Sequence, residues 1–162
     1  MKHFRAPTIL VGGLAVVALL AGNAVANTAV FNGRYAGSTT EKVNGEKITA
    51  VARGKGTATL IGKSTITGTV VATTSSDQPC APFTGPGVIA GKVGKLKVTV
   101  VPTSRGCAAG EDDRDNISLA GSVKVRGGTL KFRTAHGTLR FTGHYNRATG
   151  AFNVKLKGTL KY

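Results

Sequence analysis

Apolar and polar residues alternate with a period of two along most of the chain after residue 26. The alternation is cleanest over 151–161, where every second residue from position 152 onwards is apolar or glycine and the residues between are mostly polar. This period is typical of a β-strand with one buried face and one solvated face. No stretch of comparable length after residue 26 has helical spacing. The pattern therefore predicts an all-β protein.

Eight segments carry this alternation, more weakly towards the start of the chain. Turn-forming residues separate them, among them Asn44-Gly45, Gly62-Lys63, Gly94 and the stretch 146–150. The segment 47–61 contains internal glycines, but its apolar residues keep one parity, which favours a single bent strand. The predicted strands are about 29–39, 47–61, 64–75, 84–92, 95–102, 117–126, 137–145 and 151–161.

Four glycines fall on the apolar face of these strands, where they have no side chain to pack: Gly68, Gly121, Gly143 and Gly158. Sharp bending of a strand at a barrel corner would explain glycines at these positions. Closure of the sheet also removes the edges that an open sheet would expose. The sequence therefore predicts a single eight-stranded antiparallel up-and-down β-barrel, favoured over a sandwich. In such a meander, successive loops alternate between the two ends.

The first 26 residues have the features of a targeting segment. Lys2 and Arg5 precede an apolar run over 8–20, and Ala24-Val25-Ala26 is a small-x-small cleavage signal. The run is shorter than the about 20 residues that a spanning helix needs. We predict a signal peptide over 1–26 and one barrel domain over 27–162, with a retained membrane anchor as the alternative. The protein is then secreted, extracellular or held in the cell envelope.

The chain has two cysteines, Cys80 and Cys107. They lie in connections that the meander places at the same end of the barrel. An even pair in an exported chain is most simply one disulfide, because export leads to an oxidising compartment. Two free buried thiols are the alternative. A metal site would need more ligands than these stretches offer, so no metal is expected.

A further segment carries a family motif: Gly127-Gly128-Thr129-Leu130-Lys131-Phe132-Arg133-Thr134-Ala135-His136-Gly137-Thr138-Leu139. It resembles a motif of dirigent-like and allene-oxide-cyclase-like barrels, and the resemblance covers about residues 117–160. Leu130 and Thr134 stand where the family pattern has glycines. The resemblance implies an eight-stranded barrel. The residues themselves suggest a tight crossing, with Phe132 plugging a barrel end.

No catalytic residue is transferred from that resemblance, because fold does not carry activity. Catalytic members use polar groups inside the barrel, whereas the inward positions predicted here contain no residue that ionises near neutral pH. His136 and His144 are expected to be ordinary surface residues. The cluster over 111–115 holds four acidic residues, whose oxygens would suit Ca²⁺. Arg114 interrupts the cluster, however, and its spacing does not fit an EF-hand. A solvated loop that Arg147 can pair with is therefore favoured over a Ca²⁺ site. No cofactor is expected.

Positive charge is the strongest functional feature. The formal net charge is +15, and no acidic residue follows Asp115. Like charges on neighbouring strands cost stability, which points to a polyanion partner, and a face kept charged only for solubility is an equally weighted alternative. Nucleic acid is disfavoured, because no outward aromatic residues interleave the charges. Six basic residues share the outward parity of the last three strands: Lys124, Arg126, Arg140, Lys155, Lys157 and Lys161.

Three functions follow, and the sequence leaves them open. The favoured one is a non-enzymatic exported barrel that binds an anionic cell-envelope or extracellular polymer, or a membrane surface, through this basic outer face. The second is a carrier of a small apolar ligand inside the barrel, since inward glycines and alanines leave room. The third is a cyclase- or isomerase-like enzyme of the resembled families, which would need polar groups inside.

Overall fold

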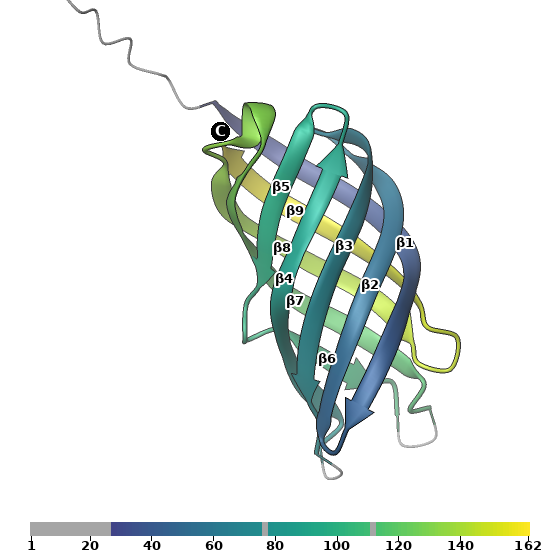
Figure 1. Ribbon diagram of the computed structural model, residues 1–162. Helices are drawn as coiled ribbons and strands as arrows, with labels where there is room; N and C mark the ends of the chain where they lie inside the picture. The colour runs from purple at the N-terminus through teal and green to yellow at the C-terminus, as the bar shows by residue number, and fades with distance from the viewer. Residues whose placement is uncertain (1–26, 76–77, 111–112) are drawn as a thin grey trace, which may run out of the picture.

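The computed structural model describes residues 27–75, 78–110 and 113–162. In this part of the chain it contains nine β-strands and one turn of 3-10 helix, η1 (Figure 1). Their bounds are β1 (Thr28–Asn44), β2 (Lys47–Ala58), β3 (Gly62–Thr73), β4 (Cys80–Gly91), β5 (Gly94–Val100), β6 (Arg105–Ala108), β7 (Asn116–Gly128), η1 (Leu130–Phe132), β8 (His136–Asn146) and β9 (Ala151–Lys161).

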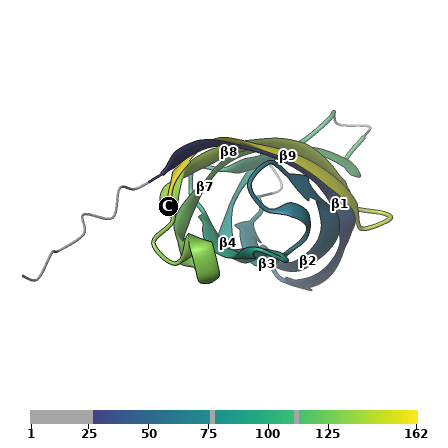
Figure 2. The same ribbon diagram turned by 90° about the horizontal axis from the view of Figure 1, so that it is seen from above.

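The strands close into a barrel, seen end-on in Figure 2. Consecutive strands from β1 to β5 pair antiparallel, as do β7, β8 and β9, and β9 returns to pair with β1. β5 and β6 together fill one position between β4 and β7, β5 pairing with residues 85–91 of β4 and β6 with residues 80–82. The predicted eight-stranded antiparallel up-and-down barrel is confirmed, with one strand interrupted. The predicted signal peptide lies outside the described residues.

Several predicted strand bounds were wrong. β1 continues to Asn44 rather than 39, and β2 ends at Ala58 rather than 61, so that a turn over 59–61 precedes Gly62. β4 begins at Cys80 rather than 84, and β6 was not predicted. β6 has four residues and includes Gly106 and Cys107, so it carries no run of large apolar side chains for the alternation to reveal.

The interruption between β5 and β6 is built around Ser104, which is fully buried. Its Oγ accepts a hydrogen bond from the Ser122 backbone N–H at 3.3 Å, and its carbonyl accepts one from the Phe83 N–H at 3.1 Å. A Cβ on Gly121 would lie 2.8 Å from the Ser104 Cα. Close approach of the neighbouring chain, rather than bending alone, therefore explains this inward glycine.

Apolar side chains fill one half of the barrel. Phe31, Leu96, Leu139 and Leu160 are all fully buried there. Phe132 of η1 is also fully buried, packs on this core, and lies 5.5 Å from the Tyr162 ring, centroid to centroid. The prediction that Phe132 plugs a barrel end is confirmed. We call this the closed end; the chain termini of the barrel and η1 lie here, at the upper end of Figure 1.

None of the helical structure in the described residues is long and apolar enough to cross a membrane.

Candidate functional site

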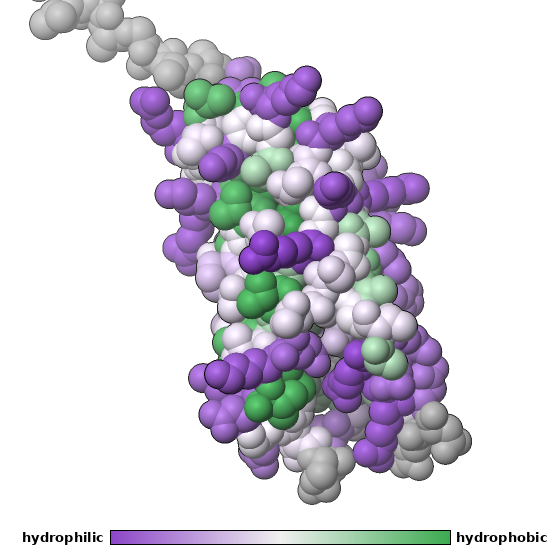
Figure 3. All heavy atoms as spheres, turned by 45° about the vertical axis from the view of Figure 1, so that its right-hand side comes forward, coloured by the Kyte–Doolittle hydropathy of each residue, from purple (hydrophilic) through white to green (hydrophobic). Residues whose placement is uncertain are grey.

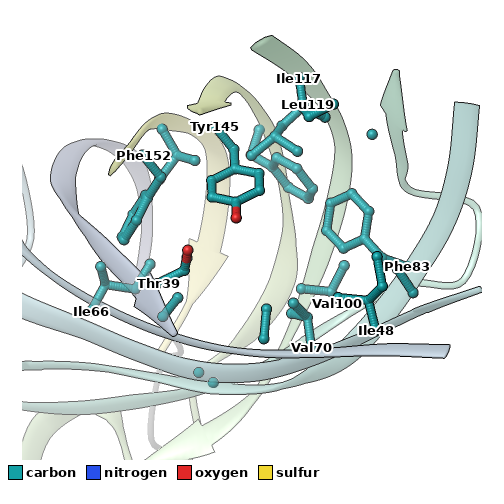
Figure 4. A pocket seen from close by; sticks show the side chains of 18 of the residues that line it. Thr39, Ile48, Ile66, Val70, Phe83, Val100, Ile117, Leu119, Tyr145 and Phe152 are labelled. Carbon is teal, nitrogen blue, oxygen red and sulfur yellow. The ribbon is translucent and has the colours of Figure 1, made fainter. Parts of the chain in front are cut away.

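The other half of the barrel contains a cavity of about 210 Å³. It opens towards the end that carries the β1–β2 turn and the disulfide, which we call the mouth. Figure 4 shows Ile48, Ile66 and Val70 on one side, with Tyr145 and Phe152 opposite. An apolar cavity of about 150 Å³ in an engineered protein holds benzene, so this volume suits a small molecule.

The cavity exists because inward residues are small in this half. Ala50, Ala52, Gly68, Ala72 and Gly87 all line it, whereas the closed half has large side chains at corresponding inward positions. The aromatic rings of the opposite wall do not reach across to fill the space (Figure 4). The inward glycines and alanines therefore leave room, as the sequence indicated.

Polar groups gather at the mouth: Thr39, Glu41, Tyr145 and Arg147 all line the cavity. Burial raises the pKa of Tyr145, and the neighbouring Glu41 carboxylate raises it further, while Thr39 and Arg147 act in the opposite direction. The hydroxyls of Tyr145 and Thr39 face each other in Figure 4, and Thr39 Oγ1 also donates to the Gly150 carbonyl at 3.0 Å. The Tyr145 hydroxyl therefore stays protonated at neutral pH and is available as a donor.

Two charged residues, Glu41 and Arg147, line the cavity, whereas the predicted inward positions contained none. Glu41 lies on the inner side because β1 continues three residues beyond it, and Glu41 has the same parity as Tyr35 and Thr39. The predicted strand ended at 39, where the sequence becomes polar. Extending the alternation through Glu41 would have found the carboxylate. Arg147 follows β8 in a turn, which no strand pattern reveals.

Cys80 and Cys107 form a disulfide, with a Cα–Cα distance of 4.0 Å. The predicted bridge is confirmed. The prediction placed both cysteines in loops, but both lie in strands. Cys80 of β4 is the direct cross-strand partner of Cys107 of β6. The bond thus fixes the short outer segment of the interrupted strand to its neighbour at the mouth.

The structure places the six predicted basic residues on the exposed outer wall of three consecutive strands. Arg140 lies directly opposite Lys157 across β8 and β9. By strand, the six are Lys124 and Arg126 on β7, Arg140 on β8, and Lys155, Lys157 and Lys161 on β9.

Barrel closure extends this basic wall beyond the predicted face. Arg34 of β1 lies directly opposite Lys155 of β9, and Lys97 of β5 is exposed on the other side of β7. Figure 3, which brings the right-hand side of Figure 1 forward, shows hydrophilic side chains along the full height of that side of the barrel as well. The sequence prediction missed Arg34 because its strand is first in the chain and becomes a neighbour of the last strand only on closure.

Acidic residues lie at the mouth instead. Glu41 and Glu46 flank the β1–β2 turn, and Asp113 and Asp115 precede β7; Glu111 and Asp112 of the predicted cluster lie outside the described residues. The Asp113 carboxylate accepts hydrogen bonds from the backbone and side chain of Asn116, which makes a local turn.

The Arg147 backbone N–H donates to the Asp115 carbonyl at 2.8 Å, so this turn and loop meet through main-chain atoms. His136 and His144 are exposed, as expected. Among the described residues, no three His, Cys, Asp or Glu side chains are grouped to hold a metal ion.

Comparison of the chain with protein-family models, with curated proteins and with solved structures finds no match.

Proposed function

We propose that the barrel binds a small, mainly apolar ligand through its mouth. The observation that carries this proposal is the cavity of about 210 Å³ with its apolar lining. Concave apolar sites with a few convergent polar groups are the usual form of small-molecule sites. Transfer of a ligand's apolar surface from water into this cavity contributes about 25 cal/mol for each Å² buried.

The polar groups at the mouth define the ligand further. The Tyr145 hydroxyl donates, and the oxygens of Thr39 and Glu41 accept, so a ligand with an apolar body and one polar group is favoured. The ionisable groups Glu41 and Arg147 lie at the rim and not in the depth of the barrel, which supports binding over catalysis. The proposed enzymatic alternative would have to use these rim residues.

Indole is a suitable probe, because it is small and apolar with one N–H, and the chain has no Trp to obscure its fluorescence. Ala52 faces the cavity and its neighbour Val51 faces outwards on the same strand. Ala52→Phe should fill the space and lower indole affinity at least tenfold. Val51→Phe is the matched control and should leave it unchanged. Absence of indole binding by the unchanged protein, or equal binding by both variants, would count against the cavity as a ligand site.

A second candidate function is binding of a soluble polyanion by the basic wall. Its support is the placement of Arg140 directly opposite Lys157 and of Arg34 opposite Lys155. Like charges in direct cross-strand positions destabilise a sheet, so a partner that neutralises them would compensate. Such binding should weaken steeply with salt, since the screening length falls to about 8 Å at physiological ionic strength.

Charge-reversal variants test this second function with dextran sulfate as the probe. Changing Arg140, Lys155 and Lys157 to Glu should abolish retention, while the fold survives because these side chains point to solvent. Changing Lys42, Lys47 and Lys63 to Glu alters net charge equally but lies outside those strands. Equal loss in both triple variants would show that only overall charge matters.

We infer that the protein is exported and acts outside the cytoplasm. The Cys80–Cys107 disulfide fits an oxidising compartment, and the first 26 residues have the composition of a signal peptide. Intact mass of the exported protein should correspond to a chain that begins at Asn27. The resemblance to dirigent-like and allene-oxide-cyclase-like barrels remains a prediction, and no activity is drawn from it.

A further inference from the structure

The closed end exposes two apolar side chains on neighbouring loops. Leu130 of η1 is 68% exposed, and Val93 of the β4–β5 turn is 41% exposed. The loops are held together by two hydrogen bonds: the Thr129 N–H donates to the Lys95 carbonyl at 2.9 Å, and the Lys95 N–H donates to Thr129 Oγ1 at 3.0 Å. Both side chains therefore project from one rigid tip.

Leu130 is unfavourable here in two respects. Its φ of +54° lies in the left-handed region, where it is the only non-glycine residue among those described. Its side chain also faces water rather than the core. An apolar side chain that faces solvent makes few packing contacts that could compensate for its strained backbone. Residues with strained backbone conformations cluster at binding sites. An external apolar environment would account for both features.

Basic residues surround this tip. Lys92 is adjacent to Val93, Lys131 and Arg133 flank Phe132, and Lys95 lies between the two loops; all four are exposed. A shallow hollow on the nearby wall is lined by Lys55, Lys63 and Lys92. The described acidic residues lie at the opposite end of the barrel. The closed end thus combines apolar side chains with unopposed positive charge.

We propose that the closed end docks on an anionic lipid bilayer, with Leu130 and Val93 entering the boundary between headgroups and acyl chains. Apolar residues with a basic surround are the pattern of proteins that lie on a membrane interface. Each Lys or Arg near an anionic leaflet adds to the attraction. A soluble polyanion would satisfy the charges but would leave Leu130 in water, which is why the bilayer is the favoured occupant.

The first and last described residues of the chain pair at the closed end. Asn27 and Tyr162 exchange two backbone hydrogen bonds of 2.9 Å at the closed end. Docking by this end is independent of the cavity, which opens at the other.

Flotation of the exported protein with vesicles tests the proposal, using phosphatidylcholine with and without phosphatidylglycerol. Leu130→Gly removes the apolar side chain and suits the left-handed backbone, so the fold is retained. It should weaken binding to the anionic vesicles at least tenfold, and Val93→Ser should weaken it further. Val43→Ala removes an equally exposed side chain (64%) at the mouth and should have no effect.

A second pair of variants separates charge at the two ends. Lys92→Glu with Lys95→Glu should abolish vesicle binding, whereas Lys42→Glu with Lys47→Glu at the mouth should retain it. Dextran sulfate distinguishes the partner, because Leu130→Gly should leave its binding unchanged. Vesicle binding that is equal in the unchanged protein and in Leu130→Gly would overturn the proposal, as would no flotation of the unchanged protein at low salt.

Discussion

The left-handed backbone at Leu130 predicts that a glycine there stabilises the fold. A non-glycine residue in this conformation costs about 1–2 kcal/mol. The side chain is 68% exposed, so its removal forfeits little apolar burial. Glycine adds an unfolded-state entropy cost of about 0.5–1 kcal/mol. The net expectation for Leu130→Gly is a gain of about 0.5–1 kcal/mol in the free energy of unfolding.

Urea denaturation followed by circular dichroism measures this change, and the urea midpoint should rise without a change in slope. Thermal unfolding should shift upwards by about 2–5 °C for a domain of this size. Leu130→Ala is the control, because it removes the same side chain but keeps the Cβ that the left-handed conformation disfavours. It should leave stability unchanged or slightly lowered.

The two variants together decide the cause. If Leu130→Gly lowers the midpoint as much as Leu130→Ala, then contacts of the leucine side chain outweigh the backbone conformation and the reasoning is refuted. If Leu130→Gly is the more stable and binds vesicles less well, then stability is given up at this position for docking, the trade-off that is common at functional sites.

Two further predictions concern the mouth and the core. Changing both Cys80 and Cys107 to Ala should lower the free energy of unfolding by about 3.5 kcal/mol, as expected for a bridge that closes a loop of this length. Thiol labelling of the unchanged protein, unfolded but not reduced, should find no reactive thiol. Burial raises the pKa of Tyr35 and Tyr145, so the unfolded chain loses these protons at lower pH than the folded one, and stability should fall as pH rises from about 10 through the folded-state pKa. Phe at both positions should flatten that fall; an unchanged slope would contradict the assignment.

The alternation of apolar and polar residues predicted the strands well where the inner face is clearly apolar and the outer face clearly polar. β9 has inward residues Phe152, Leu156 and Leu160 between polar ones, and its predicted bounds match the structure. Alternation failed where side chains are small. β6 and the start of β4 are held by pairing with each other and by the disulfide, which are contacts between distant segments and leave no local period.

The cavity was only partly accessible to sequence reasoning. Inward alanines and glycines could be counted, but their effect depends on what lies opposite. Ala52 faces Gly68 across β2 and β3, so two small residues adjoin and leave a gap. That register is set by the turn over 59–61, which joins the two strands. Arg34 was missed for a different reason, because only closure of the barrel brings it opposite Lys155.

The separation of the two proposed sites gives a last prediction. β1 has 17 residues, which at about 3.3 Å each and a tilt of about 40° makes the barrel wall about 40 Å tall. This height is several times the screening length of about 8 Å, so a bilayer at the closed end exerts little field at the mouth. Changes at distant, independent sites add within about 0.3–0.5 kcal/mol.

Ala52→Phe should therefore leave vesicle binding unchanged, and Leu130→Gly should leave indole affinity unchanged. The double variant should show both losses and no more, with indole measured without vesicles and flotation measured without indole. A larger coupling would mean that filling the cavity shifts the strands that support η1, and the two ends would then have to be treated as one linked site. Additive effects would instead assign ligand binding to the mouth and docking to the closed end. The acidic residues at the mouth and the unopposed basic residues at the closed end would then determine which end meets the membrane.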